Sequence, residues 1–141
     1  MSLIMKILVI GLLMASFVFP PELLGAEVTK RVVFPKGKTT VSYTGHLSRD
    51  FTLYDSYYFR AKKGQTLTVK LTTVEPDAIF AIYETKVLGP DEDTVVGNDR
   101  KLREWSGKLP VNGEYSVQVY DISVVDENPS GAAYTISITL R

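Results

Sequence analysis

The chain has 141 residues, with sixteen basic and sixteen acidic side chains, one histidine and no cysteine. A neutral chain lacks the basic excess that general nucleic-acid or anionic-membrane binding requires, so neither kind of partner is expected. Without cysteine there are no disulfides, and stability must come from burial of apolar side chains.

The first residues have the pattern of a cleavable signal peptide. Lys6 precedes an uncharged apolar run over 7–19, and small residues follow it. A basic start, an apolar segment and small residues in this order are typical of secretory signals. The run is short for a membrane span, so we expect cleavage after Ala26 and no membrane association afterwards. The sequence therefore predicts a signal peptide over 1–26, one domain over 27–141 and a periplasmic or secreted location.

The rest of the chain alternates between apolar and polar residues with period two. This pattern is typical of strands with one face on a core and one in water. The alternation is clear over 66–72, 115–120 and 134–140, and weaker over 41–45 and 57–61. Residues 78–83 are apolar throughout and predict a central strand buried on both faces. No segment shows a helical apolar stripe.

Turn signals separate these strands. The strongest are Lys-Lys-Gly-Gln over 62–65 and Asn-Gly at 112–113, and a third lies over 35–38. About seven or eight strands at this spacing predict an all-β fold, an antiparallel β-sandwich. The segments 85–106 and 121–132 do not fit the pattern. We expect long loops there, and such loops often carry function.

Few residues are suited to catalysis. His46 is the single histidine, so neither a serine–histidine pair nor a histidine-rich metal site is indicated, and we interpret it as an ordinary residue at a strand end. The acidic run Asp91-Glu92-Asp93 offers oxygen ligands for calcium but lacks the spacing of a calcium loop, which favours a solvated turn. No pair of acids stands out as a glycosidase site. We expect no enzymatic activity, no metal and no cofactor.

Tyrosine and arginine side chains favour a binding function instead. Tyr54 lies in a tyrosine-rich stretch with Arg49 and Arg60 nearby, and these residue types anchor many protein interfaces. Tyrosine is also an ordinary strand residue, and Trp105 is interpreted as a plug in the core. Residues 27–74 carry nine basic and three acidic side chains. A charged partner could be attracted to this segment, unless neighbouring strands bring acidic residues beside the basic ones and cancel the local charge.

Several segments together resemble bacterial pre-peptidase C-terminal domains. Residues 57–67 are similar to the family's Y-x-F-x-A-K-K-G-Q hairpin, 77–80 to its Asp-led central strand, 109–117 to its L-P-x-x-G-x-Y-x-V hairpin and 134–138 to its last strand. The resemblance spans about Val33 to Leu140 and implies a β-sandwich over nearly the whole domain.

An exported domain of this kind resembles the bacterial periplasmic inhibitors of goose-type and invertebrate-type lysozymes. Residues 130–134, Ser-Gly-Ala-Ala-Tyr, match the Ser-Gly-x-x-Tyr motif associated with lysozyme inhibitors. The resemblance implies a lysozyme as partner. It also implies a loop that enters the cleft through Ser130, Gly131 and Tyr134, with Arg49, Tyr54 or Arg60 as a second contact. The 62–65 turn is similar to the goose-type inhibitors and the motif to the invertebrate type, so both targets stay open.

One physical argument supports such a loop, and one observation counts against an exposed Tyr134. Hydroxyl groups on a protruding loop can donate hydrogen bonds in a polar cleft while blocking the sugar chain. However, Tyr134 has the same parity as Ile136 and Ile138, so a strand that began at Tyr134 would turn the ring into the core. Two alternatives remain: a carbohydrate- or matrix-binding module, assisted by calcium at 91–93, and an auxiliary domain without its own target. A homodimer through an exposed edge strand is a further option.

Overall fold

The computed structural model describes residues 28–47, 54–85, 92–122 and 132–141. The predicted signal peptide and the candidate site residues Arg49, Ser130 and Gly131 lie outside these ranges. No helix among the described residues is long and apolar enough to cross a membrane. The strands are β1 (Thr29–Arg31), β2 (Thr40–Leu47), β3 (Asp55–Ala61), β4 (Thr66–Thr73), β5 (Ala78–Thr85), β6 (Glu92–Val96), β7 (Glu104–Lys108), β8 (Gly113–Asp121) and β9 (Ala132–Leu140), with the 3-10 turn η2 (Asn98–Arg100) between β6 and β7.

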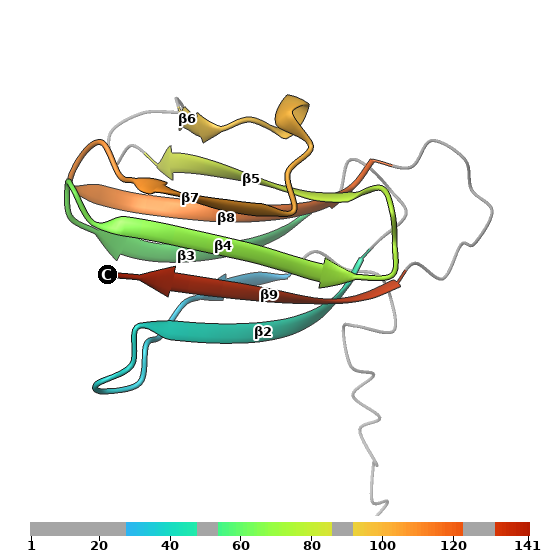
Figure 1. Ribbon diagram of the computed structural model, residues 1–141, viewed down its shortest axis with the longest axis horizontal. Coiled ribbons are helices and arrows are strands. Elements are labelled where there is room, and N and C mark those ends of the chain that lie inside the picture. The colour runs from blue at the N-terminus through green and yellow to red at the C-terminus, as the bar shows by residue number, and fades with distance from the viewer. Residues whose placement is uncertain (1–27, 48–53, 86–91, 123–131) are drawn as a thin grey trace, which may run out of the picture.

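These strands form two sheets packed on each other (Figure 1). Sheet A has the order β1-β3-β8-β5-β6, and sheet B has the order β2-β9-β4-β7. All strand pairs are antiparallel except β1 with β3. The predicted all-β sandwich is confirmed. The expectation of one long loop over 85–106 is wrong, because β6 and β7 lie within it and raise the strand number above the expected eight.

One face of each central strand supplies the core. In β4, Leu67, Val69 and Leu71 are buried while Lys70 between them is exposed, as the period-two pattern predicts. The first five residues of β5, 78–82, are all buried, in agreement with the prediction of a central strand buried on both faces. Trp105 on β7 is half-buried and packs against the core, in agreement with its interpretation as a plug.

The two strongest turn signals join the sheets and do not close hairpins. Residues 62–65 connect β3 of sheet A to β4 of sheet B, and 109–112 connect β7 of sheet B to β8 of sheet A. The two connections lie side by side, because the Lys63 amide donates to Asn112 Oδ1 at 2.7 Å. Gly64 has a φ of 87°, a backbone conformation that favours glycine. The hairpin interpretation of both turns is therefore wrong, and we call this end of the sandwich the turn end.

Tyr115 fastens the β7–β8 connection to the core. Its buried hydroxyl donates to the Val111 carbonyl at 2.7 Å and accepts from the Val111 amide at 3.2 Å. Its ring stacks on Phe59, with centroids 6.0 Å apart. Burial raises the pKa of the Tyr115 phenol, although the bond to Val111 opposes this shift. A single side chain thus holds the turn against the sandwich.

We expect Tyr115→Phe to lower the free energy of unfolding by about 1–2 kcal/mol, because Val111 loses its partner for both backbone groups. Urea unfolding with an unchanged m-value measures the loss. Tyr83→Phe in β5 is the matched control, since the Tyr83 hydroxyl makes no hydrogen bond with the described part of the chain. Equal losses in the two variants would contradict the role given to Tyr115.

Candidate functional site at the loop end

Four strand ends meet at the end of the sandwich opposite the turns, which we call the loop end. Leu47 at the end of β2 pairs with Ala132 at the start of β9. Asp55 at the start of β3 pairs with Val119 near the end of β8. The segments 48–53 and 123–131 therefore both connect residues at this end, at the right of Figure 1. These are the segments that carry Arg49, Ser130 and Gly131.

Tyr134 lies in the core. It is the third residue of β9 and is 2% exposed. Its side chain points inward together with Ile136 and Ile138, so the parity argument is right. The hypothesis that the Tyr134 ring stands exposed in a protruding plug is wrong, because β9 already begins at Ala132.

A buried hydrogen-bond network surrounds the Tyr134 hydroxyl. This hydroxyl donates to Asp55 Oδ2 at 2.5 Å, and the Tyr57 hydroxyl lies 2.6 Å from it. Since the single Tyr134 proton is used by the carboxylate, Tyr57 must donate to the Tyr134 oxygen. The Val28 amide donates to Asp55 Oδ1 at 2.9 Å. The Asp55–Tyr134–Tyr57 network thus joins β3 of sheet A to β9 of sheet B.

The Tyr134 ring occupies a space that a glycine leaves open. Gly45 on β2 pairs directly with Tyr134. A Cβ atom at Gly45 would lie 2.4 Å from Tyr134 Cζ, which is far too close for a real contact. On the other side of the network, Tyr43 stacks on Tyr57 with centroids 5.4 Å apart, and Lys30 Nζ lies 4.6 Å from the centre of the Tyr43 ring. The two hydroxyls are therefore held in place by close packing.

Burial sets the ionisation of the two tyrosines. Desolvation raises the pKa of Tyr134, and its hydrogen bond to Asp55 adds to the shift. Desolvation also raises the pKa of Tyr57, while its hydrogen bond with Tyr134 opposes the shift and the charge of Asp55 adds to it. Both phenols therefore stay protonated well above the pH at which an exposed tyrosine ionises.

The loop end also exposes apolar surface. Val74, in the turn between β4 and β5, is 93% exposed, and the Tyr54 ring is 36% exposed and rests on Tyr120 at 5.1 Å between centroids. The Arg103 guanidinium fixes the Val74 turn by donating to the Ala78 carbonyl at 3.3 Å and to the Glu75 carbonyl. Sequence reasoning missed Val74. The sign of this site in the sequence is that Val74, an apolar residue, lies just beyond the alternating pattern over 66–72.

The structure does not bring Arg60 to the loop end. Arg60 pairs with Glu114 near the other end of β3, about 17 Å from Asp55 at the usual rise per residue. Arg60 and Tyr54 therefore lie at opposite ends of β3. His46 is exposed one residue before the end of β2, as expected for a strand-end residue. Within the described ranges, no three histidine or acidic side chains are grouped as a metal site would require.

Comparison with solved structures identifies the fold of this chain. No family model and no curated protein matches the chain. PliG from Aeromonas hydrophila, a periplasmic lysozyme inhibitor of g-type lysozyme, has a TM-score of 0.67 and 24% sequence identity, covering 82% of this chain and 98% of its own. PliG from Salmonella Typhimurium has a TM-score of 0.57 and 21% identity, covering 82% and 100%. A mutant of Escherichia coli PliG has a TM-score of 0.57 and 22% identity, with the same coverage. The chain has the fold of these proteins.

We expect Tyr134→Phe to cost about 2–3 kcal/mol of unfolding free energy, because a buried carboxylate loses a charge-assisted hydrogen bond. Tyr57→Phe should cost less, about 1 kcal/mol, because Asp55 keeps its donor. Adding Asp55→Asn to Tyr134→Phe should recover part of the loss, since no charge is then left without its donor. Chemical denaturation of the unaltered protein, the two tyrosine variants, Asp55→Asn and the double variant tests this order. Additive effects of Asp55→Asn and Tyr134→Phe would contradict the network.

Alkaline titration provides an independent test. A raised pKa in the folded state means that the protonated phenol stabilises the fold. This contribution is complete below the unfolded-state pKa of about 10 and is lost as pH rises through the folded-state value. The phenolate absorbance should show that three of the eight tyrosines, Tyr57, Tyr115 and Tyr134, ionise only when circular dichroism reports unfolding. Titration of all eight in a folded protein would contradict the burial.

Proposed function

We propose that the protein is a periplasmic inhibitor of g-type lysozyme that obstructs the enzyme's substrate cleft. The observation that carries the proposal is the likeness of its fold to PliG proteins over 98% or more of their length. The signal peptide expected over 1–26 supports the location. The same likeness is the reason to choose the g-type enzyme over the invertebrate type that the Ser-Gly-x-x-Tyr motif alone favours.

The loop end is the surface that we propose for the lysozyme. Val74 is a fully exposed apolar side chain next to polar ones, and exposed apolar residues of this kind often mark interfaces. Tyr54 supplies an aromatic ring that is already packed on one side, so little side-chain entropy would be lost on binding. Arg49 and Ser130, in the two segments that connect residues at this end, complete the proposed contact set with Gly131.

Tyr134 has a different role in this proposal from the one that the motif suggests. Its hydroxyl is bound to Asp55, the second residue after segment 48–53, and it lies three residues after Gly131. The Asp55–Tyr134–Tyr57 network therefore ties together the points where both segments rejoin the sandwich. We propose Tyr134 as a positioning residue that lowers the ordering cost of the contact, with Ser130 and Gly131 as the residues that touch the enzyme.

The deciding experiment is lysis of peptidoglycan suspensions by purified g-type, invertebrate-type and chicken-type lysozymes with added protein. We expect inhibition of the g-type enzyme at about micromolar concentration or below, corresponding to at least about 8 kcal/mol of binding free energy. The other two enzymes should need far more protein. If none of the three enzymes is inhibited, the proposal fails.

Two valine variants locate the contact. Val74→Ala should weaken inhibition about tenfold, because a well-placed apolar side chain in an interface contributes 1 kcal/mol or more. Val111→Ala is the matched control, since Val111 is also exposed, at 37%, but lies at the turn end. Equal effects of the two variants would place the contact elsewhere on the molecule. Ser130→Ala tests the motif in the same assay.

A further inference from the structure

The turn end carries a cluster of basic side chains that the inhibition of an enzyme at the loop end does not use. Arg60, Lys62 and Lys63 are all exposed around the β3–β4 turn. Lys108 is exposed at the end of β7, where it pairs with Thr66 at the start of β4. None of these four side chains forms an ion pair with an acid of the described ranges. We call these four residues the basic turn.

The basic turn is rigid and borders a shallow pocket. The pocket has a volume of about 340 Å³ and is lined by Arg60, Ala61, Lys62, Asn112 and Gly113. Both of its walls are fixed: Gln65 Oε1 accepts from the Lys62 amide at 2.7 Å, and Asn112 Oδ1 accepts from the Lys63 amide at 2.7 Å. A ligand would therefore meet a preformed surface and would not have to order it.

The groups at the pocket select for an anion. Because the Asn112 carbonyl oxygen is occupied, its amide NH₂ is the group left to bind a ligand. The Arg60 guanidinium and the Lys62 ammonium are donors without acceptor capacity. The arginine fork suits the two oxygens of a carboxylate or phosphate. An anionic group at this place can thus receive hydrogen bonds from three side chains.

Acidic residues on the neighbouring strands limit the shape of that ligand. Glu84 Oε1 lies 3.7 Å from where a Gly113 Cβ would be, and Glu114 is paired with Arg31 at 2.5 Å. Asp93 on β6 is exposed and pairs in the sheet with Glu84. A broad anionic surface such as a membrane would also approach the Glu84 carboxylate and be repelled by it. A thin chain lying along the basic turn would avoid Glu84.

Resting on the proposed function, we propose that the basic turn binds the free carboxylates of the peptide chains of peptidoglycan. The lysozyme that the loop end would meet acts on this same polymer. The two surfaces lie at opposite ends of β3, so both can be occupied at once. The inhibitor would then be held on the substrate, and its local concentration where the enzyme arrives would rise.

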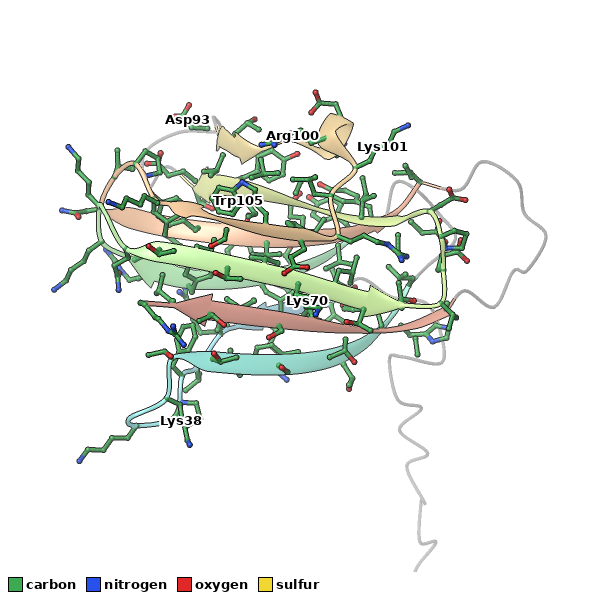
Figure 2. The ribbon with its side chains drawn as sticks, in the orientation of Figure 1. Lys38, Lys70, Asp93, Arg100, Lys101 and Trp105 are labelled. Carbon is green, nitrogen blue, oxygen red and sulfur yellow. The ribbon has the colours of Figure 1, made fainter. Side chains whose placement is uncertain are left out.

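The test is co-sedimentation of the whole protein with insoluble peptidoglycan in the absence of any lysozyme. We expect Lys62→Gln with Lys63→Gln to weaken binding about tenfold at low ionic strength, because two charge-assisted contacts are lost. Lys70→Gln with Lys101→Gln is the control, with the same change in net charge. Figure 2 shows Lys70 on the face of sheet B and Lys101 beside η2, both away from the basic turn. Equal weakening in the two double variants would overturn the proposal.

Two further arms identify the ligand. The protein should no longer sediment with peptidoglycan whose carboxylates have been converted to amides. It should still sediment with peptidoglycan whose peptide amino groups have lost their charge by acetylation. Undiminished binding to the amidated polymer, or stronger binding to vesicles of phosphatidylglycerol than to peptidoglycan, would overturn the proposal.

Inhibition of g-type lysozyme on a soluble N-acetylglucosamine oligomer separates this proposal from the proposed function. This substrate carries no peptide, so the Lys62→Gln/Lys63→Gln variant should inhibit as well as the unaltered protein. If the protein binds peptidoglycan through the basic turn but inhibits no lysozyme, the proposed function fails and the carboxylate site stands. If it inhibits but does not sediment, the carboxylate site is wrong.

Discussion

The burial of the Asp55 carboxylate is the constraint on which the arrangement of the two sheets depends. An ionised carboxylate inside a sandwich costs several kcal/mol unless hydrogen bonds replace its water. Here the Val28 amide and the Tyr134 hydroxyl take the place of water as donors to the carboxylate, and the Tyr57 hydroxyl is hydrogen-bonded to that of Tyr134. These partners come from the chain before β1 and from the opposite sheet. Apolar packing tolerates small shifts between two sheets, but this set of donors is complete in one alignment alone.

That alignment gives the sandwich two ends of different character. At the turn end, the connections over 62–65 and 109–112 cross between the sheets and are held by Tyr115 and by the Lys63–Asn112 hydrogen bond. At the loop end, the Asp55–Tyr134–Tyr57 network fixes the strand ends that longer segments connect. A rigid base under a longer segment is the usual way in which β-sandwiches present a binding surface. The turn end instead offers charges on a backbone with little freedom, which suits a small anionic group.

The strands were predictable from the sequence where apolar residues alternate over several positions. The sets 67, 69, 71 and 134, 136, 138 each exclude a helix and assign the buried face. The sequence pattern did not predict β6 and β7, because each has five residues and lies at a sheet edge, where few apolar positions are needed. A turn signal also cannot tell a hairpin from a connection between sheets, since the local backbone is similar. The hydrogen bond between Tyr134 and Asp55 joins residues that are 79 positions apart, and no local pattern encodes such a pairing.

The position of Tyr134 changes what a Ser-Gly-x-x-Tyr motif can mean in this fold. Three residues lie between the serine and the tyrosine, and β9 begins among them at Ala132. Tyr134 therefore belongs to the core and donates a hydrogen bond to Asp55, whereas Ser130 precedes the strand. A change at the tyrosine acts first on folding, through an uncompensated carboxylate, and reaches any partner only through the base of the segment. Residues of one short motif can thus be retained for two different physical reasons, and a loss of binding after a change at the tyrosine does not by itself place that residue in the interface.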